Sequence, residues 1–232
     1  WAWRELAELR ALEGKHSEAE TAYRTAAELE PDEASNDGLK AFLLRCADKR
    51  DASLPWLERS VERSGDYLWG WREIIDLHLV RGRANEAEAA ARRGLVAIPD
   101  SAPLLGLLAE SLRRQGRHAE ALVPIASALE QAPLVPQLHA LKAELLAEQS
   151  EYDAALPSAR KAASLDASPE YQALLAQVLV AAGQLDEGGE LATRLIAGPQ
   201  PLLPLFELQA VLAERHDDHP EALRWCDRGL VA

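Results

Sequence analysis

Four potential metal ligands stand in a row at His216, Asp217, Asp218 and His219. Imidazole nitrogens and carboxylate oxygens are ligands for zinc and other divalent ions. Pro220 follows at once, and proline is favoured at the first position of a helix, with a capping residue just before it. We therefore interpret the run as a polar turn that leads into a last helix, and we predict no metal site.

The common motifs of catalytic and cofactor sites are absent from the sequence. It contains no G-x-G, no P-loop, no G-x-S-x-G, no H-E-x-x-H and no C-x-x-C. These patterns supply phosphate cradles, nucleophiles and metal ligands in many enzymes. We therefore expect no catalytic residue and no cofactor, and we predict that the chain is not an enzyme.

The charge balance limits the partners. The 232 residues carry 25 Lys and Arg against 38 Asp and Glu, a formal charge of -13. Such a chain repels a phosphate backbone, so we expect no nucleic-acid binding. The sequence contains no apolar run of membrane-spanning length, so we expect no membrane insertion and favour the cytoplasm. The Ala-rich, Arg-rich and Lys-poor usage is typical of a bacterial source.

Small residues recur through the chain in one register. One column holds Ala or Ile, a second Ala, Ser or Gly, and a third mostly small residues, at spacings of 33 or 34 residues. The first column is Ala7, Ala41, Ile75, Ala109, Ala143, Ala176 and Ala210; the second is Ala19, Ser53, Ala87, Ala121, Ala155, Gly188 and Ala222; the third is Ala26, Ser60, Gly94, Ala128, Ala162, Leu195 and Gly229. Small side chains let two helices cross closely, so these columns predict helix contacts.

Turn signals fall in the same register. One slot holds Gly14, Asp48, Gly82, Gly116, Ser150, Gly183 and Asp217, and another holds Pro31, Pro99 and Pro133. These types suit helix ends and turns. Between them, apolar residues recur at spacings of three and four, as helices require. The sequence therefore predicts an all-α chain of seven helix pairs, which must stack to bury their apolar faces.

The columns resemble the tetratricopeptide repeat. The first unit carries Trp3, Leu6, Ala7, Ala19, Tyr23, Ala26 and Pro31, and the third carries Trp71, Ile74, Ala87, Gly94 and Pro99. The resemblance implies a right-handed superhelical solenoid of stacked antiparallel helix pairs. It divides residues 1–232 into repeats at 1–33, 34–67, 68–101, 102–135, 136–168, 169–202 and 203–232. The family pattern places Trp3 and Trp71 in the core.

The sequence begins and ends within expected helices. We expect it to be a segment of a longer protein, and an alternative is that its open ends are buried by self-association. Cys46 and Cys226 lie in distant repeats, so they cannot pair within the chain. Cys226 stands in a core slot, and we expect it to be a small buried side chain.

The resemblance implies that first helices line a concave groove for a protein or peptide. One groove slot holds Glu8, Phe42, Asp76, Glu110, Glu144, Gln177 and Val211. Stacked helices lie about 8–10 Å apart and an extended peptide advances about 10 Å in three residues. Asp76, Glu110 and Glu144 could therefore meet every third residue of a basic, extended partner. An alternative is that these acids are a solvated face.

Arginine and tryptophan share this surface. Arg72 stands four residues before Asp76 and could neutralise it, and Arg113 shares another slot of this surface with Arg45. Trp1 and Trp69 precede the core tryptophans by two residues, which the resemblance assigns to the concave side. They could anchor a partner, or they could pack at the end of the helix on the preceding repeat.

Two family subtypes are excluded by the same slots. The chaperone-binding carboxylate clamp needs Lys and Asn where this chain holds Arg, Gly, Ala and Glu. The asparagine ladder of the glycosyltransferase superhelix is replaced at Glu5, Leu39, Glu73, Leu107, Leu141, Leu174 and Leu208. We expect a scaffold or adaptor that binds a partner segment in its groove. Two alternatives are a substrate-recruiting arm of a larger enzyme, such as a glycosyltransferase, and a self-associating structural array.

Overall fold

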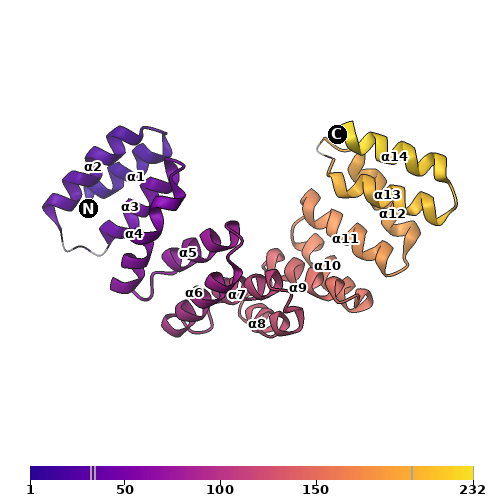
Figure 1. Cartoon of the computed structure of the whole chain (residues 1–232), viewed down its shortest axis with the longest axis horizontal. Coiled ribbons are helices and arrows are strands. Elements are labelled where there is room, and N and C mark those ends of the chain that lie inside the picture. Colours follow the sequence, from indigo (N-terminus) through magenta and orange to yellow (C-terminus); the bar gives the residue numbers. More distant parts are fainter. Residues whose placement is uncertain (32, 34, 200, 232) are drawn as a thin grey trace. The chain divides into compact units, whose positions relative to one another are not determined.

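The computed structural model describes residues 1–31, 33, 35–199 and 201–231 of the chain. These residues form fourteen α-helices and no strand (Figure 1). The helices are α1 (Ala2–Leu12), α2 (His16–Leu29), α3 (Ser35–Cys46), α4 (Arg50–Arg63), α5 (Leu68–Val80), α6 (Ala84–Ala97), α7 (Ala102–Arg114), α8 (His118–Gln131), α9 (Pro136–Glu148), α10 (Tyr152–Leu165), α11 (Pro169–Ala181), α12 (Leu185–Ile196), α13 (Leu203–Arg215) and α14 (His219–Val231).

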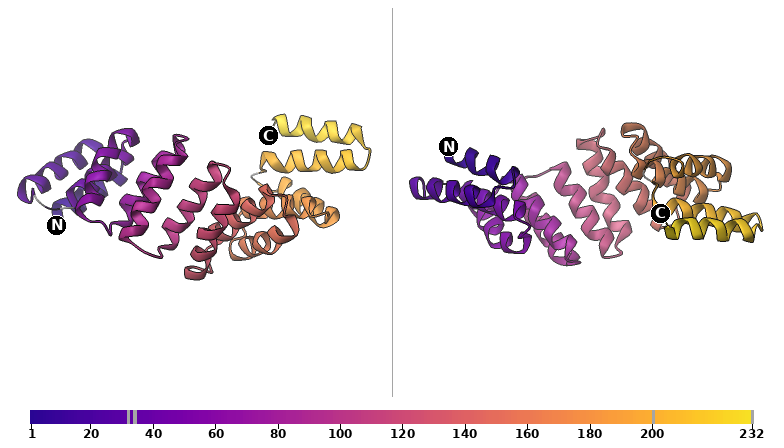
Figure 2. Two further views of the ribbon diagram at one scale, coloured as in Figure 1. Left: turned by 60° about the horizontal axis from the view of Figure 1, so that its bottom comes forward. Right: turned by 90° about the horizontal axis from the view of Figure 1, so that it is seen from above.

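The helices gather into two compact units. The N-terminal unit is Trp1–Gly116, with α1 to α7, and the C-terminal unit is Arg117–Ala232, with α8 to α14. Within each unit, consecutive helices pack as antiparallel hairpins, as α13 and α14 do in Figure 2. The prediction of an all-α helical-repeat fold is confirmed.

The columns of small residues lie where helices cross. No member of the first column is more than 7% exposed, and its Ala7, Ala109 and Ala143 are fully buried. In the third column, a Cβ added at Gly94 would lie 3.1 Å from the ring of Trp71. A larger side chain there would force α5 and α6 apart, because packed helices leave no free volume at their crossing. The repeat register therefore follows from packing.

The turn slot has a left-handed backbone in all seven repeats. Its φ angle is 75° at Gly14, and the three non-glycine members Asp48, Ser150 and Asp217 have φ angles of 55°, 62° and 57°. At Gly14 the next amide, of Lys15, donates to Arg10 O at 2.8 Å, while Gly14 N donates to Ala11 O at 3.0 Å. This pair of hydrogen bonds is the Schellman motif, which satisfies carbonyls at a helix end. Each first helix is thus followed by the same left-handed turn residue.

The apolar core is built mainly from alanine and leucine. A cluster in the N-terminal unit joins Ala7, Ala19 and Tyr23 to Leu39 and Leu43. A larger cluster in the C-terminal unit runs from α9 to α13 and includes Leu179, Leu205 and Phe206. Each cluster spans successive helix pairs, because one pair alone cannot cover its own apolar face.

Two burial predictions are wrong. Trp3 is 43% exposed, whereas Trp71 in the same repeat slot is 4% exposed and donates from Nε1 to Gly65 O at 2.7 Å. The helix that carries Trp71, α5, packs on α4 of the preceding pair, and no described helix precedes α1. Cys226 is exposed, although Ala192, one repeat earlier, is fully buried where α13 packs on α12. The repeat slot sets the direction of a side chain, and the neighbouring helix sets its burial.

Candidate functional site

The predicted groove slot lies on the first helices of the repeats. In the N-terminal unit, α1 contributes Glu8, α3 Phe42, α5 Asp76 and α7 Glu110. Glu144 lies on α9 in the C-terminal unit. The same slot thus places an aromatic ring between two carboxylates along the N-terminal unit, and this face is the candidate site.

Three aromatic rings cluster where α3 meets the start of α5. The ring centroids of Phe42 and Trp69 are 6.2 Å apart, and those of Tyr67 and Trp69 are 5.8 Å apart. Both pairs are tilted, an arrangement that directs a positive ring edge toward a negative ring face. Trp69 thus packs on the preceding repeat, which agrees with the packing alternative for this residue.

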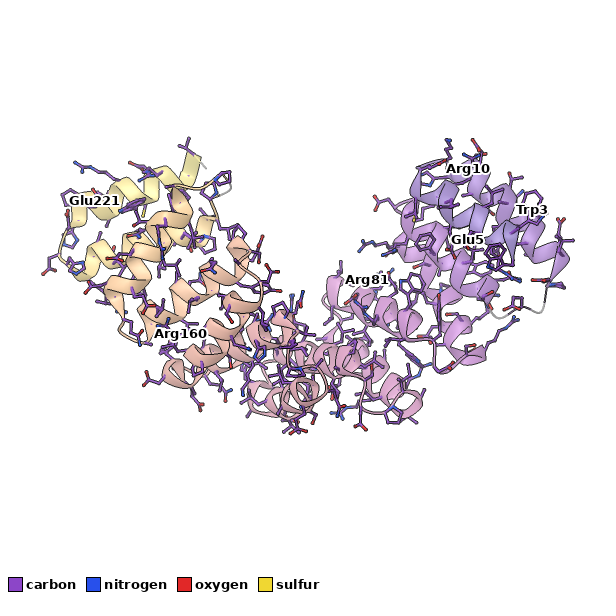
Figure 3. All side chains as sticks on the ribbon, turned by 180° about the vertical axis from the view of Figure 1, so that it is seen from behind. Trp3, Glu5, Arg10, Arg81, Arg160 and Glu221 are labelled. Atoms are coloured by element: carbon purple, nitrogen blue, oxygen red, sulfur yellow. The ribbon has the colours of Figure 1, made fainter. Side chains whose placement is uncertain are left out.

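A pocket of about 220 Å³ opens beside these rings. We call it the aromatic pocket. Its wall comes from α1, α3 and the start of α5 and includes Arg4, Glu8, Gly38, Phe42, Tyr67 and Trp69. The structure therefore brings together Glu8 and Trp69, two residues that the sequence nominated separately. Figure 3 marks Glu5 and Trp3 on α1, the helix that forms one wall.

Tyr67 is the aromatic wall residue that the sequence did not nominate. Its hydroxyl lies 2.7 Å from the position that a Cβ on Gly38 would take, and its ring lies 2.7 Å from such a Cβ on Gly70. Both glycines are inside helices, where glycine is unfavourable, so they are explained by the space that Tyr67 needs. A glycine within each of two neighbouring first helices was the available signal.

The basic groups near the pocket already have acidic partners. Arg4 is paired with Glu30, and its Nε donates to Asn36 Oδ1 at 3.2 Å. Arg45 pairs with Glu73 at 3.2 Å. The Arg45 guanidinium also lies 5.3 Å and 5.6 Å from the ring centroids of Phe42 and Trp69. Both cations are therefore balanced within the fold.

The acids Glu8 and Asp76 have no ion-pair partner within the described residues. Burial raises the pKa of Glu8, and the neighbouring Glu5 carboxylate raises it further. Burial also raises the pKa of Asp76, against the opposing charges of Arg72 and Arg50. Arg72 is exposed and forms no close pair with Asp76. Asp76 is half-buried and Glu8 is exposed, and neither has a fixed counterion in the described part of the chain. A cationic ligand could pair with either carboxylate.

Glu110 has a different environment. Arg113 Nε donates to it at 2.7 Å and Arg114 Nε at 2.6 Å. Although burial acts to raise its pKa, these hydrogen bonds and charges lower the pKa below the ordinary range. The Glu110 charge is thus neutralised by its own helix, so within this slot of the N-terminal unit the acids without an ion pair are Glu8 and Asp76.

Trp1 and Trp69 differ in exposure. Trp1 is 81% exposed at the start of α1, while Trp69 is partly buried in the pocket wall. A partner-anchoring role for Trp1 stays a prediction.

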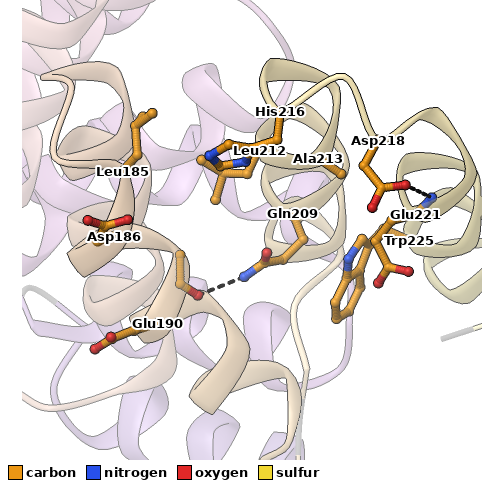
Figure 4. Close-up of a pocket in the computed structure, with 11 residues that line it drawn as sticks. Leu185, Asp186, Glu190, Gln209, Leu212, Ala213, His216, Asp218, Glu221 and Trp225 are labelled. Atoms are coloured by element: carbon orange, nitrogen blue, oxygen red, sulfur yellow. Dashed lines mark hydrogen bonds between the residues drawn. The ribbon is translucent and has the colours of Figure 1, made fainter.

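A second pocket, of about 480 Å³, lies in the C-terminal unit (Figure 4). Its wall holds Trp225 and several acids, and the amide of Gln209 crosses it to donate to Gly189 O at 2.7 Å. Asp218 Oδ1 accepts from Glu221 N at 3.1 Å, so this Asp caps α14. This hydrogen bond confirms that residues 216–219 form a polar turn that leads into α14. In the described part of the chain, no group of three His, Cys, Asp or Glu side chains is placed to hold a metal ion.

The sequence matches a family model described as a tetratricopeptide repeat, over residues 72–139 and 108–171. Solved structures show the same fold. One is the hetero-tetramer Cut9–Hcn1 of the APC/C, with a TM-score of 0.76 and 11% identity; the match covers 96% of this chain and 44% of that one. This chain therefore spans less than half the length of that relative.

Two further structures are described as tetratricopeptide repeat proteins. The protein from Parabacteroides merdae gives a TM-score of 0.75 with 13% identity, covering all of this chain and 93% of that one. YrrB, described as having an unusual peptide-binding site, gives a TM-score of 0.60 with 16% identity, covering 84% and 97%. A search of curated proteins found no match.

The central part of the chain thus matches a tetratricopeptide repeat model, and the described residues have the fold of solved tetratricopeptide repeat proteins. This fold is a general scaffold for protein–protein interaction. None of the described helices has the length and apolar character that a bilayer crossing requires.

Proposed function

We propose that the chain is a non-catalytic interaction scaffold that binds an extended, basic segment of a partner protein along α1, α3 and α5. The observation that supports this proposal is that two carboxylates of one slot, the exposed Glu8 and the half-buried Asp76, lack ion pairs within the described residues and have raised pKa values. A partner cation would pair with each acid, and at the half-buried Asp76 it would offset the desolvation of the charge.

The repeat spacing gives the expected pattern of the partner. Glu8 and Asp76 are two repeats apart, which corresponds to about 20 Å at the usual spacing of packed helices. An extended chain covers that length in about six residues. We therefore expect two basic residues about six positions apart, with a side chain between them that contacts Phe42. We do not expect Glu110 to bind a basic residue of the partner, because its carboxylate already pairs with Arg113 and Arg114.

The test is binding of the whole chain to an immobilised peptide library in which two basic positions are moved relative to each other. We expect selection of Lys or Arg pairs about six residues apart, and binding that weakens as salt rises. The double variant Glu8→Lys, Asp76→Lys should abolish this selection.

The control is Glu28→Lys, Glu62→Lys, which makes the same charge change at exposed acids on the second helices α2 and α4. If both double variants lose the selection of basic peptides equally, net charge and not the position of Glu8 and Asp76 explains the binding, and the proposal is wrong. Selection of acidic peptides by the unmodified chain would overturn the proposal.

A further inference from the structure

The aromatic pocket differs from the rest of the groove because it combines π faces with an acid. Phe42, Tyr67 and Trp69 form its aromatic side, and Glu8 lies on the opposite helix, α1. Aromatic rings attract organic cations through the negative potential of their faces, and a carboxylate beside them adds a full charge. This combination favours an alkylammonium group over a neutral alkyl group.

The charge balance of the wall supports the same preference. Arg4 is the one cation among the wall residues, and Glu30 and Asn36 hold its guanidinium. Glu8 has no cationic partner among the described residues. Its negative charge reaches Tyr67, since Glu8 adds to the rise that burial causes in the pKa of that phenol. The pocket thus carries an uncompensated negative charge.

The rings already interact with one cation. The guanidinium of Arg45 lies against Phe42 and Trp69, yet Arg45 is not part of the pocket wall. Glu73 balances its charge at 3.2 Å. The surface of the rings that faces the pocket remains open for a second cation.

We infer that the aromatic pocket receives a lysine side chain of the bound partner segment, with the aliphatic stem against Phe42 and Trp69 and the ammonium group near Glu8. The inference rests on the proposed function, because it assigns one basic residue of the partner to this pocket. The lysine ammonium is a compact point charge on a flexible four-carbon stem, so the stem can lie on the rings while the charge reaches Glu8.

The probe is N-acetyl-lysine N-methylamide, titrated into the whole chain and followed by ligand-observed NMR. The matched neutral probe is N-acetyl-norleucine N-methylamide, which keeps the stem and lacks the ammonium group. We expect the lysine probe to bind about tenfold more tightly than the norleucine probe. Glu8→Gln should remove most of this difference, while Glu28→Gln on α2 should leave it unchanged.

Trp69→Leu should weaken the lysine probe without changing the circular dichroism of the folded chain. Equal binding of both probes would make the pocket a neutral apolar anchor and overturn the inference. Absence of lysine-probe binding would overturn it as well. In either case, continued selection of basic peptides by the library would leave the proposed function standing, so the two failures are distinguishable.

Discussion

Asp76 and Glu110 occupy the same slot of consecutive repeats, and their pKa values move in opposite directions. Burial raises the pKa of Asp76, which has no ion pair among the described residues. Glu110 is also partly buried, but Arg113 and Arg114 donate to both of its oxygens and lower its pKa. The difference arises from two arginines on α7 that α5 lacks at those positions, where it has Leu79 and Val80.

This contrast predicts opposite effects on stability. A carboxyl whose folded pKa is raised destabilises the ionised protein, so Asp76→Asn should increase the free energy of unfolding at pH 7. The gain should disappear as the pH falls and Asp76 becomes protonated in both states. Urea denaturation at pH 7 and pH 3 measures it. A destabilising effect of Asp76→Asn at pH 7 would contradict the assigned pKa direction.

Glu110→Gln should show the reverse. Its lowered pKa contributes stability above the ordinary Glu range, and this contribution is lost as the pH falls through the folded pKa. We therefore expect Glu110→Gln to destabilise the chain at pH 7 and to have little effect at strongly acidic pH. A pH-independent loss would instead indicate that packing of the side chain, and not its charge, is responsible.

Gly38→Ala should close the aromatic pocket. The added Cβ would lie 2.7 Å from the Tyr67 hydroxyl, and the far end of that side chain must move. Alanine gains about 1 kcal/mol of helix propensity over glycine, which offsets part of the contact cost. We expect a change in the free energy of unfolding within about 1 kcal/mol and loss of lysine-probe binding. Gly189→Ala on α12, outside this pocket, is the control and should leave binding unchanged.

Ser150→Gly should stabilise the chain. Ser150 holds a φ of 62° in the turn between α9 and α10, a conformation that costs a residue with a Cβ about 1 kcal/mol. We expect an increase of roughly that size in the free energy of unfolding, measured by urea denaturation. Gly183→Ala is the reciprocal variant. No neighbouring atom lies within 4 Å of its added Cβ, so any loss of stability comes from the backbone alone.

Gln209→Leu tests the hydrogen bonds between α12 and α13. The buried amide of Gln209 donates to Gly189 O at 2.7 Å and to Thr193 Oγ1 at 2.9 Å. We expect a loss of about 1–2 kcal/mol in the free energy of unfolding, because two bonds disappear inside a packed interface. Gln137→Leu, at an exposed position of α9, should change it by less than about 0.5 kcal/mol. Equal effects at the two sites would refute the assigned role.

The sequence by itself determined the local structure. Helix periodicity and the turn slot follow from interactions within a few residues, and for this reason the residue pattern alone places Gly14 and Ser150 at helix ends, where their backbones are left-handed. The columns of small residues could also be recognised in the sequence, because the helices cross in the same way in every repeat. The repeat boundaries and the residues that contact a partner stay predictions.

Only the tertiary structure decided what each slot contacts. Trp3 and Trp71 share a slot, but only α5, which carries Trp71, packs on a preceding described helix pair. Likewise α13 packs on α12, which carries the buried Ala192, while no described helix follows the one that carries Cys226. The aromatic pocket likewise needs Glu8, Gly38 and Tyr67, which come from α1, α3 and the segment that leads into α5. A repeat pattern fixes the direction in which a side chain points from its own helix, whereas burial, charge balance and pockets depend on the neighbouring helices.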